Sequence, residues 1–175
     1  MRGERQVEIE PLVGVVMGSD SDLPVVKDCL LILEELGIAA EARIMSAHRT
    51  PILVMEYATQ AEKRGLKVLI AAAGGAAHLG GVLAAHTLLP VIGLPILGHS
   101  LAGMDALFSM VQMPPGIPVA TVGVNNGRNA GLLAAQILGT SDPKIKERLL
   151  AYRQSLAQSV SEKDRRLRNW GFREY

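Results

Sequence analysis

Residues 68–73 read Val-Leu-Ile-Ala-Ala-Ala, a continuous apolar run that ends in two glycines. A strand with one face in water alternates apolar and polar side chains, whereas a strand covered on both faces needs no polar position. Residues 13–17 form a shorter apolar run, and residues 42–45, 91–96 and 119–124 are further strand candidates. The sequence therefore predicts a parallel sheet that is buried on both faces.

Helical patterns lie between these runs. Apolar residues recur every three or four positions from Pro24 to Gly37, from Pro51 to Gly65, and across residues 129–138. Strands that alternate with helices indicate an α/β fold, most economically a flavodoxin-like three-layer sandwich with strand order 2-1-3-4-5. In such a sheet ligands bind at the carboxyl ends of the strands, beside the point where the strand order reverses.

The composition is that of one domain with a sizeable core, because 49% of the 175 residues are hydrophobic and the mean hydropathy is +0.23. We expect residues 1–10 to be a flexible arm and residues 11–140 to be the catalytic α/β domain. The arm lacks the apolar core of a signal peptide, and no apolar run approaches the length of a membrane span. Cys29 is the only cysteine and is expected to be a buried thiol. These features fit a cytoplasmic protein.

The C-terminal tail, residues 141–175, differs from the rest of the chain. It carries nine Lys and Arg against five Asp and Glu, and residues 143–169 show the spacing of a long amphipathic helix. It also holds four of the six aromatic residues: Tyr152, Trp170, Phe172 and Tyr175. The apolar face of such a helix is longer than a small domain can cover. We therefore expect the helix to dock on a neighbouring subunit rather than on nucleic acid.

Two junctions between strand and helix carry polar side chains suited to an anionic ligand. Residues 18–22, Gly-Ser-Asp-Ser-Asp, precede a helix whose free N–H groups and dipole attract phosphate. Residues 46–51, Ser-Ala-His-Arg-Thr-Pro, place Thr50 as the expected N-cap of the next helix. Arg49 offers a bidentate fork for phosphate or carboxylate, and His48 can exchange a proton near neutral pH.

A third junction, residues 74–78, reads Gly-Gly-Ala-Ala-His, and its glycines let the backbone approach a ligand closely. The spacing of a nucleoside-triphosphate loop and the dinucleotide pattern G-x-G-x-x-G are both absent, so neither ATP nor NAD is indicated. His78 and His86 are eight residues apart and lack a third ligand in register, which argues against zinc. We therefore expect no cofactor and no metal.

Each of these residues also has a purely structural interpretation. Ser19 and Ser21 can cap a helix or a turn, and Asp20 is best read as an acid favoured by the helix dipole. A single histidine at the end of a loop is often only a hydrogen-bonded structural residue, and this is the favoured interpretation for His86 and His99.

Taken in order, these three junctions resemble the signatures of the N5-carboxyaminoimidazole ribonucleotide mutase family. The resemblance runs from about residue 13 to 138 and includes residues 111–114, Val-Gln-Met-Pro, and 118–122, Pro-Val-Ala-Thr-Val. It implies an isomerase of de novo purine (IMP) biosynthesis that acts on a small ribonucleotide. In that reaction a carboxylate moves from the exocyclic nitrogen of an aminoimidazole ribonucleotide to ring carbon C4, without metal, ATP or biotin.

The resemblance also assigns roles by position. It implies His48 as the catalytic proton carrier, and it places the remaining substrate contacts at Ser19, Ser21, Asp22, Ser46 and Arg49 for phosphate and ribose, and at Gly74, Gly75, Ala76, His78 and Leu79 for the carboxylate or CO2. It further implies a homo-octamer, with active sites where subunits meet, and functional coupling to the ATP-dependent synthetase that makes the substrate.

Two segments depart from the family pattern. Residues 79–82 read Leu-Gly-Gly-Val where Leu-Pro-Gly-Met is usual, so Gly80 is expected to loosen that loop. Residues 97–100, Leu-Gly-His-Ser, are also atypical. Two alternatives remain open at this point: a carboxylase that uses CO2 directly, and a non-catalytic phosphate or nucleotide sensor.

Overall fold

A computed structural model describes residues 10–98 and 100–175 of the chain. Five parallel strands form its central sheet in the order β2-β1-β3-β4-β5, which confirms the predicted topology. The strands are β1 (Val13–Met17), β2 (Ala40–Ile44), β3 (Val68–Gly74), β4 (Val91–Ile96) and β5 (Ala120–Thr121). The predicted bounds were wrong at the two edge strands, since β2 begins at Ala40 rather than Ala42 and β5 has only two residues. Each edge strand pairs on one side only, so local composition defines its ends less sharply.

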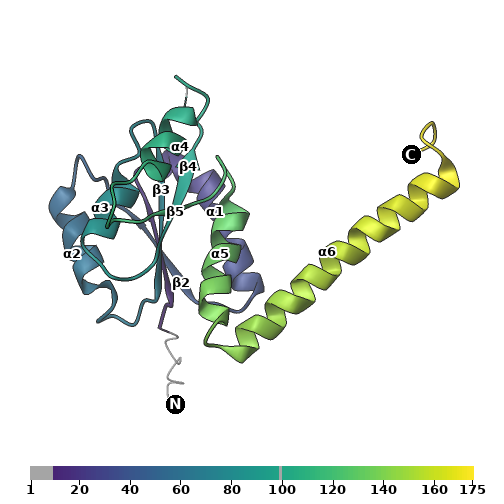
Figure 1. Ribbon diagram of the computed structural model, residues 1–175, viewed down its shortest axis with the longest axis horizontal. Helices are drawn as coiled ribbons and strands as arrows, with labels where there is room; N and C mark the ends of the chain where they lie inside the picture. The colour runs from purple at the N-terminus through teal and green to yellow at the C-terminus, as the bar shows by residue number, and fades with distance from the viewer. Residues whose placement is uncertain (1–9, 99) are drawn as a thin grey trace, which may run out of the picture.

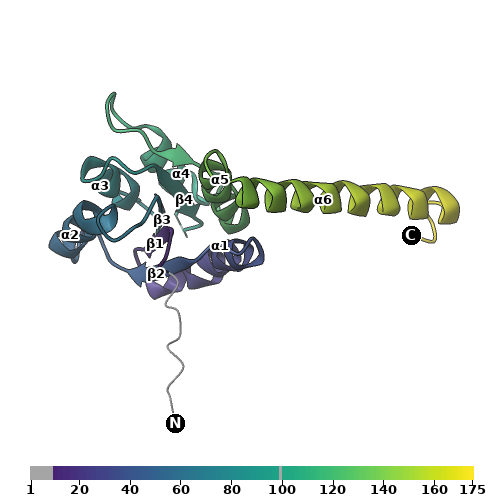
Figure 2. The same ribbon diagram turned by 90° about the horizontal axis from the view of Figure 1, so that it is seen from below.

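Helices cover both faces of the sheet (Figure 1, Figure 2). One face holds α1 (Leu23–Glu35) and α5 (Gly127–Gly139), and the other holds α2 (Pro51–Ala61), α3 (Leu79–Ala85) and α4 (Met104–Val111). A single turn of 3-10 helix, Asp20–Asp22, leads into α1. The helix predicted over residues 129–138 is therefore α5, which starts two residues earlier and ends one residue later.

The position of β3 between two layers of helices explains why its sequence is apolar throughout. Val68, Ile70 and Ala72 pack into the core beneath α1 and α5. Leu69, Ala71 and Ala73 pack into the second core beneath α2, α3 and α4. Every residue of the predicted run is thus buried against one helical layer or the other, as a parallel sheet covered on both faces requires.

Helices α1 and α5 approach each other closely because α5 carries glycine at the contact. A Cβ on Gly131 would lie 2.8 Å from the carbonyl oxygen of Cys29, and a Cβ on Gly127 would clash with the carbonyl oxygen of Val25. The Cys29 thiol lies in this contact and is fully buried, as expected, and burial raises its pKa to about 12. The thiol therefore stays protonated and acts as a small apolar side chain.

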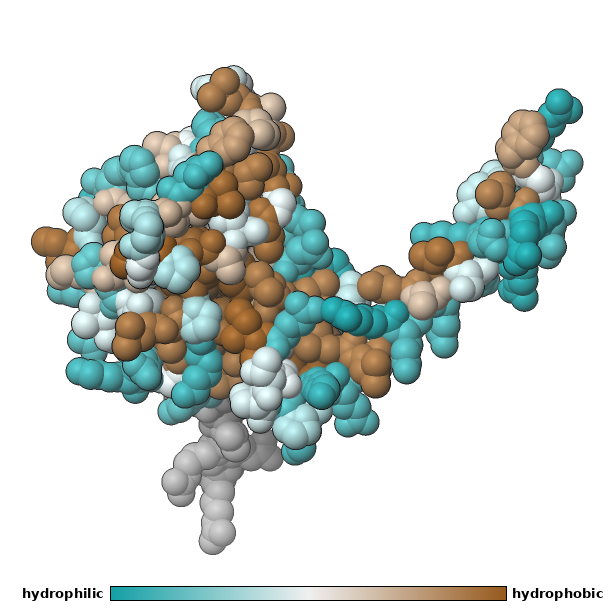
Figure 3. Space-filling model, in the orientation of Figure 1, coloured by the Kyte–Doolittle hydropathy of each residue, from teal (hydrophilic) through white to brown (hydrophobic). Residues whose placement is uncertain are grey.

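The last helix, α6 (Pro143–Trp170), projects away from the sheet (Figure 1). Ile145 is its buried anchor, and every residue from Arg153 onward is exposed. Apolar side chains remain exposed along it, including Leu156 and Trp170, and Figure 3 shows hydrophobic residues interspersed with hydrophilic ones on this arm. The long helix predicted for the tail is confirmed, with an end one residue later than expected. Within the described residues, no helix has the length and hydropathy needed to cross a membrane.

The glycine contact between α1 and α5 gives a first prediction. Gly131→Ala should destabilise the protein by about 1–3 kcal/mol, because the added methyl would have to push apart two packed helices. The matched control is Gly80→Ala in α3, where the new Cβ would meet its nearest neighbour at an ordinary 3.5 Å. That change should stabilise by about 0.4–1 kcal/mol through the unfolded chain. Urea unfolding of both variants measures the difference; equal stabilities would contradict the role of the α1–α5 contact.

Candidate active site

The register of the sheet brings the three polar junctions to one edge. Met17, the last residue of β1, pairs with Ile44 at the end of β2 and with Ala72 near the end of β3. The loops that follow these strands therefore start at nearly the same level. They enclose a pocket of about 460 Å³, which is lined by Gly18, Ser19, Ser21, Asp22, Ser46, Ala47, His48, Arg49, Ala73, Gly74, Ala77, His78 and Leu79.

This lining contains most of the predicted site residues but not all of them. Gly75 and Ala76 are not part of it, because the chain turns between Gly74 and Ala77. Four further residues line the pocket but were not individually assigned a role from the sequence: Gly18, Ala47, Ala73 and Ala77. Glycine and alanine carry no functional group, so only their position beside predicted residues could have pointed to them.

The first junction caps itself. The Ser19 hydroxyl accepts from the Ser21 N–H, and the Asp22 carboxylate accepts from the Ser19 N–H at 3.1 Å, which together form a capping box. The Asp22 N–H donates to the Ser19 carbonyl oxygen at 3.2 Å. The expectation of free N–H groups here was therefore wrong for Ser19, Ser21 and Asp22, because the loop satisfies them internally. The seryl hydroxyls are left as the better donors to a ligand.

Asp22 is the one charged residue among the buried side chains of the described chain. Burial raises the pKa of its carboxyl group, although hydrogen bonds from Ser19 and Ser21 oppose that shift. Asp20, by contrast, is exposed, does not line the pocket and accepts from Ser19 and Ser21, as its structural interpretation requires. A buried carboxylate that lacks full hydration is suited to accept hydrogen bonds from the hydroxyl groups of a ligand.

The second junction is a rigid loop closed by Ser46 and Thr50. The Thr50 hydroxyl donates to the Ser46 carbonyl oxygen at 3.1 Å and accepts from the Ser46 N–H at 2.9 Å. Thr50 does occupy the N-cap position of α2, and Pro51 follows it as expected, but its side chain does not cap the helix. The capping role was wrong because the hydroxyl closes the loop instead. The Ser46 hydroxyl accepts from the N–H groups of His48 and Arg49.

Arg49 joins the first two junctions. Its guanidinium donates to the carbonyl oxygen of Gly18 at 2.7 Å. Among the described residues this is its one side-chain hydrogen bond, which leaves other N–H donors of the planar fork available to an anion. The positive charge thus lies at the first junction, and Arg49 lines the same pocket as Ser19 and Ser21, where phosphate was expected.

His48 and His78 join the second and third junctions. Nε2 of His48 lies 2.7 Å from Nδ1 of His78, and the two rings meet edge to face with their centroids 4.9 Å apart. At that distance one nitrogen donates the proton and the other accepts it. The family resemblance placed His78 among the contacts to the carboxylate or CO2, and in the structure its Nδ1 is also the hydrogen-bond partner of His48.

The third junction is a tight turn with unusual backbone angles. The Ala77 N–H donates to the Gly74 carbonyl oxygen, Gly75 has φ +63°, and Ala77 has φ +35°. A positive φ at alanine is uncommon and costs conformational energy. The turn brings the buried methyl group of Ala77 and the side chain of His78 into the pocket lining. Next to it, Gly80 is buried in the first turn of α3.

His86 is not part of the pocket lining. His86 ends α3, where its Nδ1 contacts the Val82 carbonyl oxygen at 2.8 Å, as its structural interpretation predicted. His99, in the atypical segment 97–100, lies outside the described residues, as do residues 1–9 of the predicted arm. In the part of the chain that is described, no group of three His, Cys, Asp or Glu residues is arranged to hold a metal ion.

The fold and pocket define a doubly wound α/β protein with a pocket at the carboxyl edge of the sheet, where ligands bind in proteins of this architecture. Residues 12–159 match the sequence profile described as AIR carboxylase, and the chain belongs to that family. It is 55% identical over 166 residues to the N5-carboxyaminoimidazole ribonucleotide mutase of Pyrococcus horikoshii, a match that covers 95% of this chain and 94% of that protein.

Two further comparisons agree with this assignment. The chain is 50% identical over 165 residues to the phosphoribosylaminoimidazole carboxylase of Schizosaccharomyces pombe, which covers 94% of this chain but 30% of that protein. A crystal structure of Treponema denticola PurE has a TM-score of 0.82 to this fold and 34% sequence identity, covering 90% of this chain and 98% of that one.

The buried carboxylate gives a second prediction. Burial favours the protonated form of Asp22, so the folded-state pKa is raised. The stability that this carboxyl group contributes is therefore fully present below its unfolded pKa and is lost as the pH rises through its folded pKa. Asp22→Asn should therefore stabilise the ligand-free protein at pH 7, and the gain should be lost at about pH 3, below the ordinary aspartate pKa of about 3.9, where the carboxyl group is protonated in both the folded and the unfolded state. Urea unfolding at both pH values measures it. Asp28→Asn, at an exposed position of α1, is the control; a variant less stable than wild type at pH 7 would contradict the prediction.

Proposed function

We propose that the protein is a mutase that converts N5-carboxyaminoimidazole ribonucleotide to 4-carboxy-5-aminoimidazole ribonucleotide in de novo purine biosynthesis. The observation that carries this proposal is the His48–His78 pair in a pocket that also holds Arg49 and Asp22. A proton carrier, an anion-binding cation and a buried hydroxyl acceptor are the groups that a phosphorylated, carboxylated nucleotide requires. The identity to the Pyrococcus horikoshii mutase over nearly the whole of both chains supports it.

Binding follows from the first two junctions. The hydroxyl groups of Ser19, Ser21 and Ser46 and the free edge of Arg49 donate to the phosphate, while Asp22 accepts hydrogen bonds from the ribose hydroxyls. Displacing the long internal hydrogen bonds of the first loop, at 3.1–3.5 Å, costs little, so the hydroxyls can turn toward the ligand.

The chemistry uses one proton carrier. The carbamate N–C bond breaks, the exocyclic nitrogen takes a proton from His48, and CO2 is released beside the ring. Carbon C4, which is electron-rich, then attacks the CO2 carbon, and the proton that leaves C4 returns to His48, so the reaction is a net isomerisation. His78 holds the imidazole of His48 through the 2.7 Å contact and fixes which ring nitrogen faces the substrate.

The third junction would retain the CO2. Ala73, Ala77 and Leu79 are buried and apolar, and they line the pocket beside the histidine pair. Apolar walls exclude water, which favours loss of charge from the carbamate and keeps CO2 from hydration. Gly74 allows this wall to approach β4, because a Cβ there would lie 3.3 Å from the Ile96 carbonyl oxygen.

A direct, CO2-dependent carboxylase is the second candidate, since half of the aligned positions match the Schizosaccharomyces pombe phosphoribosylaminoimidazole carboxylase. The deciding experiment incubates metal-stripped protein with freshly made N5-carboxyaminoimidazole ribonucleotide, without ATP or bicarbonate, and follows the C4-carboxylated isomer by ultraviolet absorbance. Conversion supports the mutase. Conversion of aminoimidazole ribonucleotide plus bicarbonate alone would support the carboxylase, and binding without turnover of either would support a nucleotide sensor.

The third prediction concerns the proton carrier. His48→Asn should lower kcat about 10²–10⁴-fold with little change in KM, because the variant keeps the binding groups but cannot transfer a proton. His86→Asn is the matched control, since His86 contacts the Val82 carbonyl oxygen and does not line the pocket. Steady-state kinetics on both variants tests the role; equal kcat values for wild type and His48→Asn would refute it.

The proposal extends to the assembly. The exposed apolar residues of α6 support docking of residues 141–175 on another copy of the chain, in a cytoplasmic homo-octamer of the kind that the family resemblance implies. Residues 11–140 would then supply the catalytic domain, with functional coupling to the ATP-dependent synthetase that makes the substrate. Sedimentation velocity of the full chain, compared with a chain that ends at Thr140, tests the role of the tail.

A further inference from the structure

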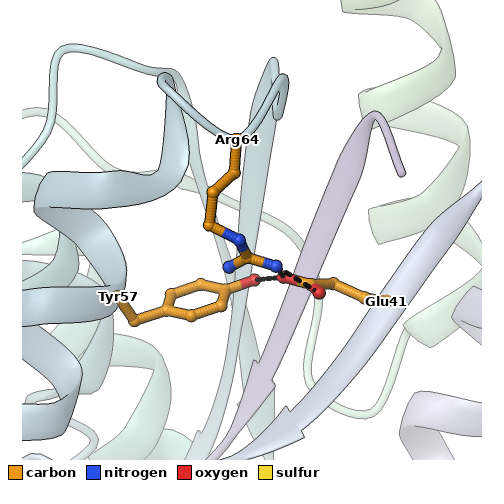
Figure 4. Close-up of polar contacts among 3 residues, drawn as sticks. All are labelled: Glu41, Tyr57 and Arg64. Atoms are coloured by element: carbon orange, nitrogen blue, oxygen red, sulfur yellow. Dashed lines mark hydrogen bonds and ion pairs between the residues drawn. The ribbon is translucent and has the colours of Figure 1, made fainter. Parts of the chain in front are cut away.

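A cluster of three side chains joins β2 to α2, away from the pocket (Figure 4). The Tyr57 hydroxyl donates to Oε1 of Glu41 at 2.7 Å, and the Arg64 guanidinium donates to both carboxylate oxygens of Glu41, at 2.7 and 2.6 Å. Arg64 also lies over the Tyr57 ring, 5.3 Å from its centroid. These residues come from the start of β2, the middle of α2 and the turn after α2.

The cluster crosses the neighbouring strand β1 because Gly14 leaves room for it. Gly14 is the register partner of Glu41, so both positions face the same side of the sheet. A Cβ on Gly14 would clash with the Tyr57 hydroxyl. The tyrosine therefore reaches over β1 from α2 and meets the carboxylate of the edge strand.

Strand β2 has few other attachments on this face. Arg43, which shares this face with Glu41, is exposed, and so are Ala42 and Ile44 on the opposite face, although β2 carries the loop with His48 and Arg49. The described hydrogen bonds and ion pairs join a β2 side chain to α2 or its following turn at Glu41 alone. The cluster therefore ties β2 to α2 and to the turn after α2, at the end of the two elements that is farther from the loop.

The charge state of the cluster is stable at neutral pH. Burial would raise the pKa of Glu41, but the hydrogen bonds from Arg64 and Tyr57 outweigh it and hold the pKa below its usual range. Tyr57 is almost fully buried, and burial together with Glu41 raises the pKa of its hydroxyl. Glu41 is thus ionised and Tyr57 is protonated, which preserves every bond of the cluster.

We propose that Glu41, Tyr57 and Arg64 are positioning residues that hold the loop of residues 45–50 so that His48 meets His78. This inference rests on the proposed function of His48. The loop is internally rigid through Ser46 and Thr50, so it moves as a block when β2 and α2 shift relative to each other. The long side chain of Arg49 can follow Gly18 through such a shift, whereas the short imidazole of His48 loses its contact.

The kinetic test follows from that difference. Tyr57→Phe and Glu41→Gln should each lower kcat about tenfold and change KM less than about twofold, because a small displacement of a catalytic group affects the transition state most. The chain contains a matched control: Glu35, Arg128 and Tyr152 form a second cluster of the same composition, with a 2.8 Å ion pair and a 5.3 Å cation–π contact, which joins α1, α5 and α6. Glu35→Gln should leave both constants within about twofold of wild type.

Two further measurements distinguish the positioning role from a general loss of stability in the variants. Calorimetric titration with 4-carboxy-5-aminoimidazole ribonucleotide at 10 °C gives the fraction of competent sites, and kcat per competent site should remain low in Tyr57→Phe and Glu41→Gln. Hydrogen exchange of the full-length protein should be faster in residues 45–50 of these variants and unchanged in Glu35→Gln, with residues 18–23 as internal reference.

The outcomes distinguish the two proposals. Wild-type kcat per competent site in both variants, or unchanged exchange in residues 45–50, would overturn the positioning role. If the wild-type protein itself shows no turnover, the proposed function fails, and the exchange of residues 45–50 still decides whether the cluster holds the loop.

Discussion

The parallel pairing of β1 with β2 on one edge and with β3 on the other is the constraint on which the site depends. It places Met17 level with Ile44 and Ala72, so that three loops begin at nearly the same level at the carboxyl edge of the sheet. A slip of β2 by one residue would displace its loop by about 3.3 Å and reverse the face on which Glu41 lies. The contacts of Arg49 with Gly18 and of His48 with His78 would then both be lost.

The pocket is organised before any ligand arrives. The Ser19 hydroxyl and the Asp22 carboxylate accept from backbone N–H groups of the first loop, Ser46 and Thr50 close the second loop, and Ala77 holds a strained angle in the third. Each loop satisfies its own polar groups, so the remaining freedom lies mainly in hydroxyl groups and in the Arg49 fork. Catalysis benefits from such preorganisation because the groups need not rearrange during the reaction. The positioning cluster at Glu41 extends the same principle to the strand that carries the second loop.

Sequence reasoning succeeded where a single physical requirement dominates. The run at residues 68–73 must be buried on both faces, which led to the parallel sheet and its strand order. It failed where two local options compete. Thr50 could cap α2 or bond to Ser46, and the N–H groups of Ser19, Ser21 and Asp22 could remain free or pair within the loop. The edge strands β2 and β5 were misplaced because half of their pairing is absent.

The sequence by itself determined the layers of the fold and the functional groups that each junction carries, since apolar periodicity and the residue types at strand ends are local properties. It could not determine which side chains meet. The 2.7 Å approach of His48 to His78 joins residues 30 positions apart, and the Glu41–Tyr57–Arg64 cluster depends on the space above Gly14 on another strand. These contacts are products of strand register and helix packing, and they exist only once the sheet has formed.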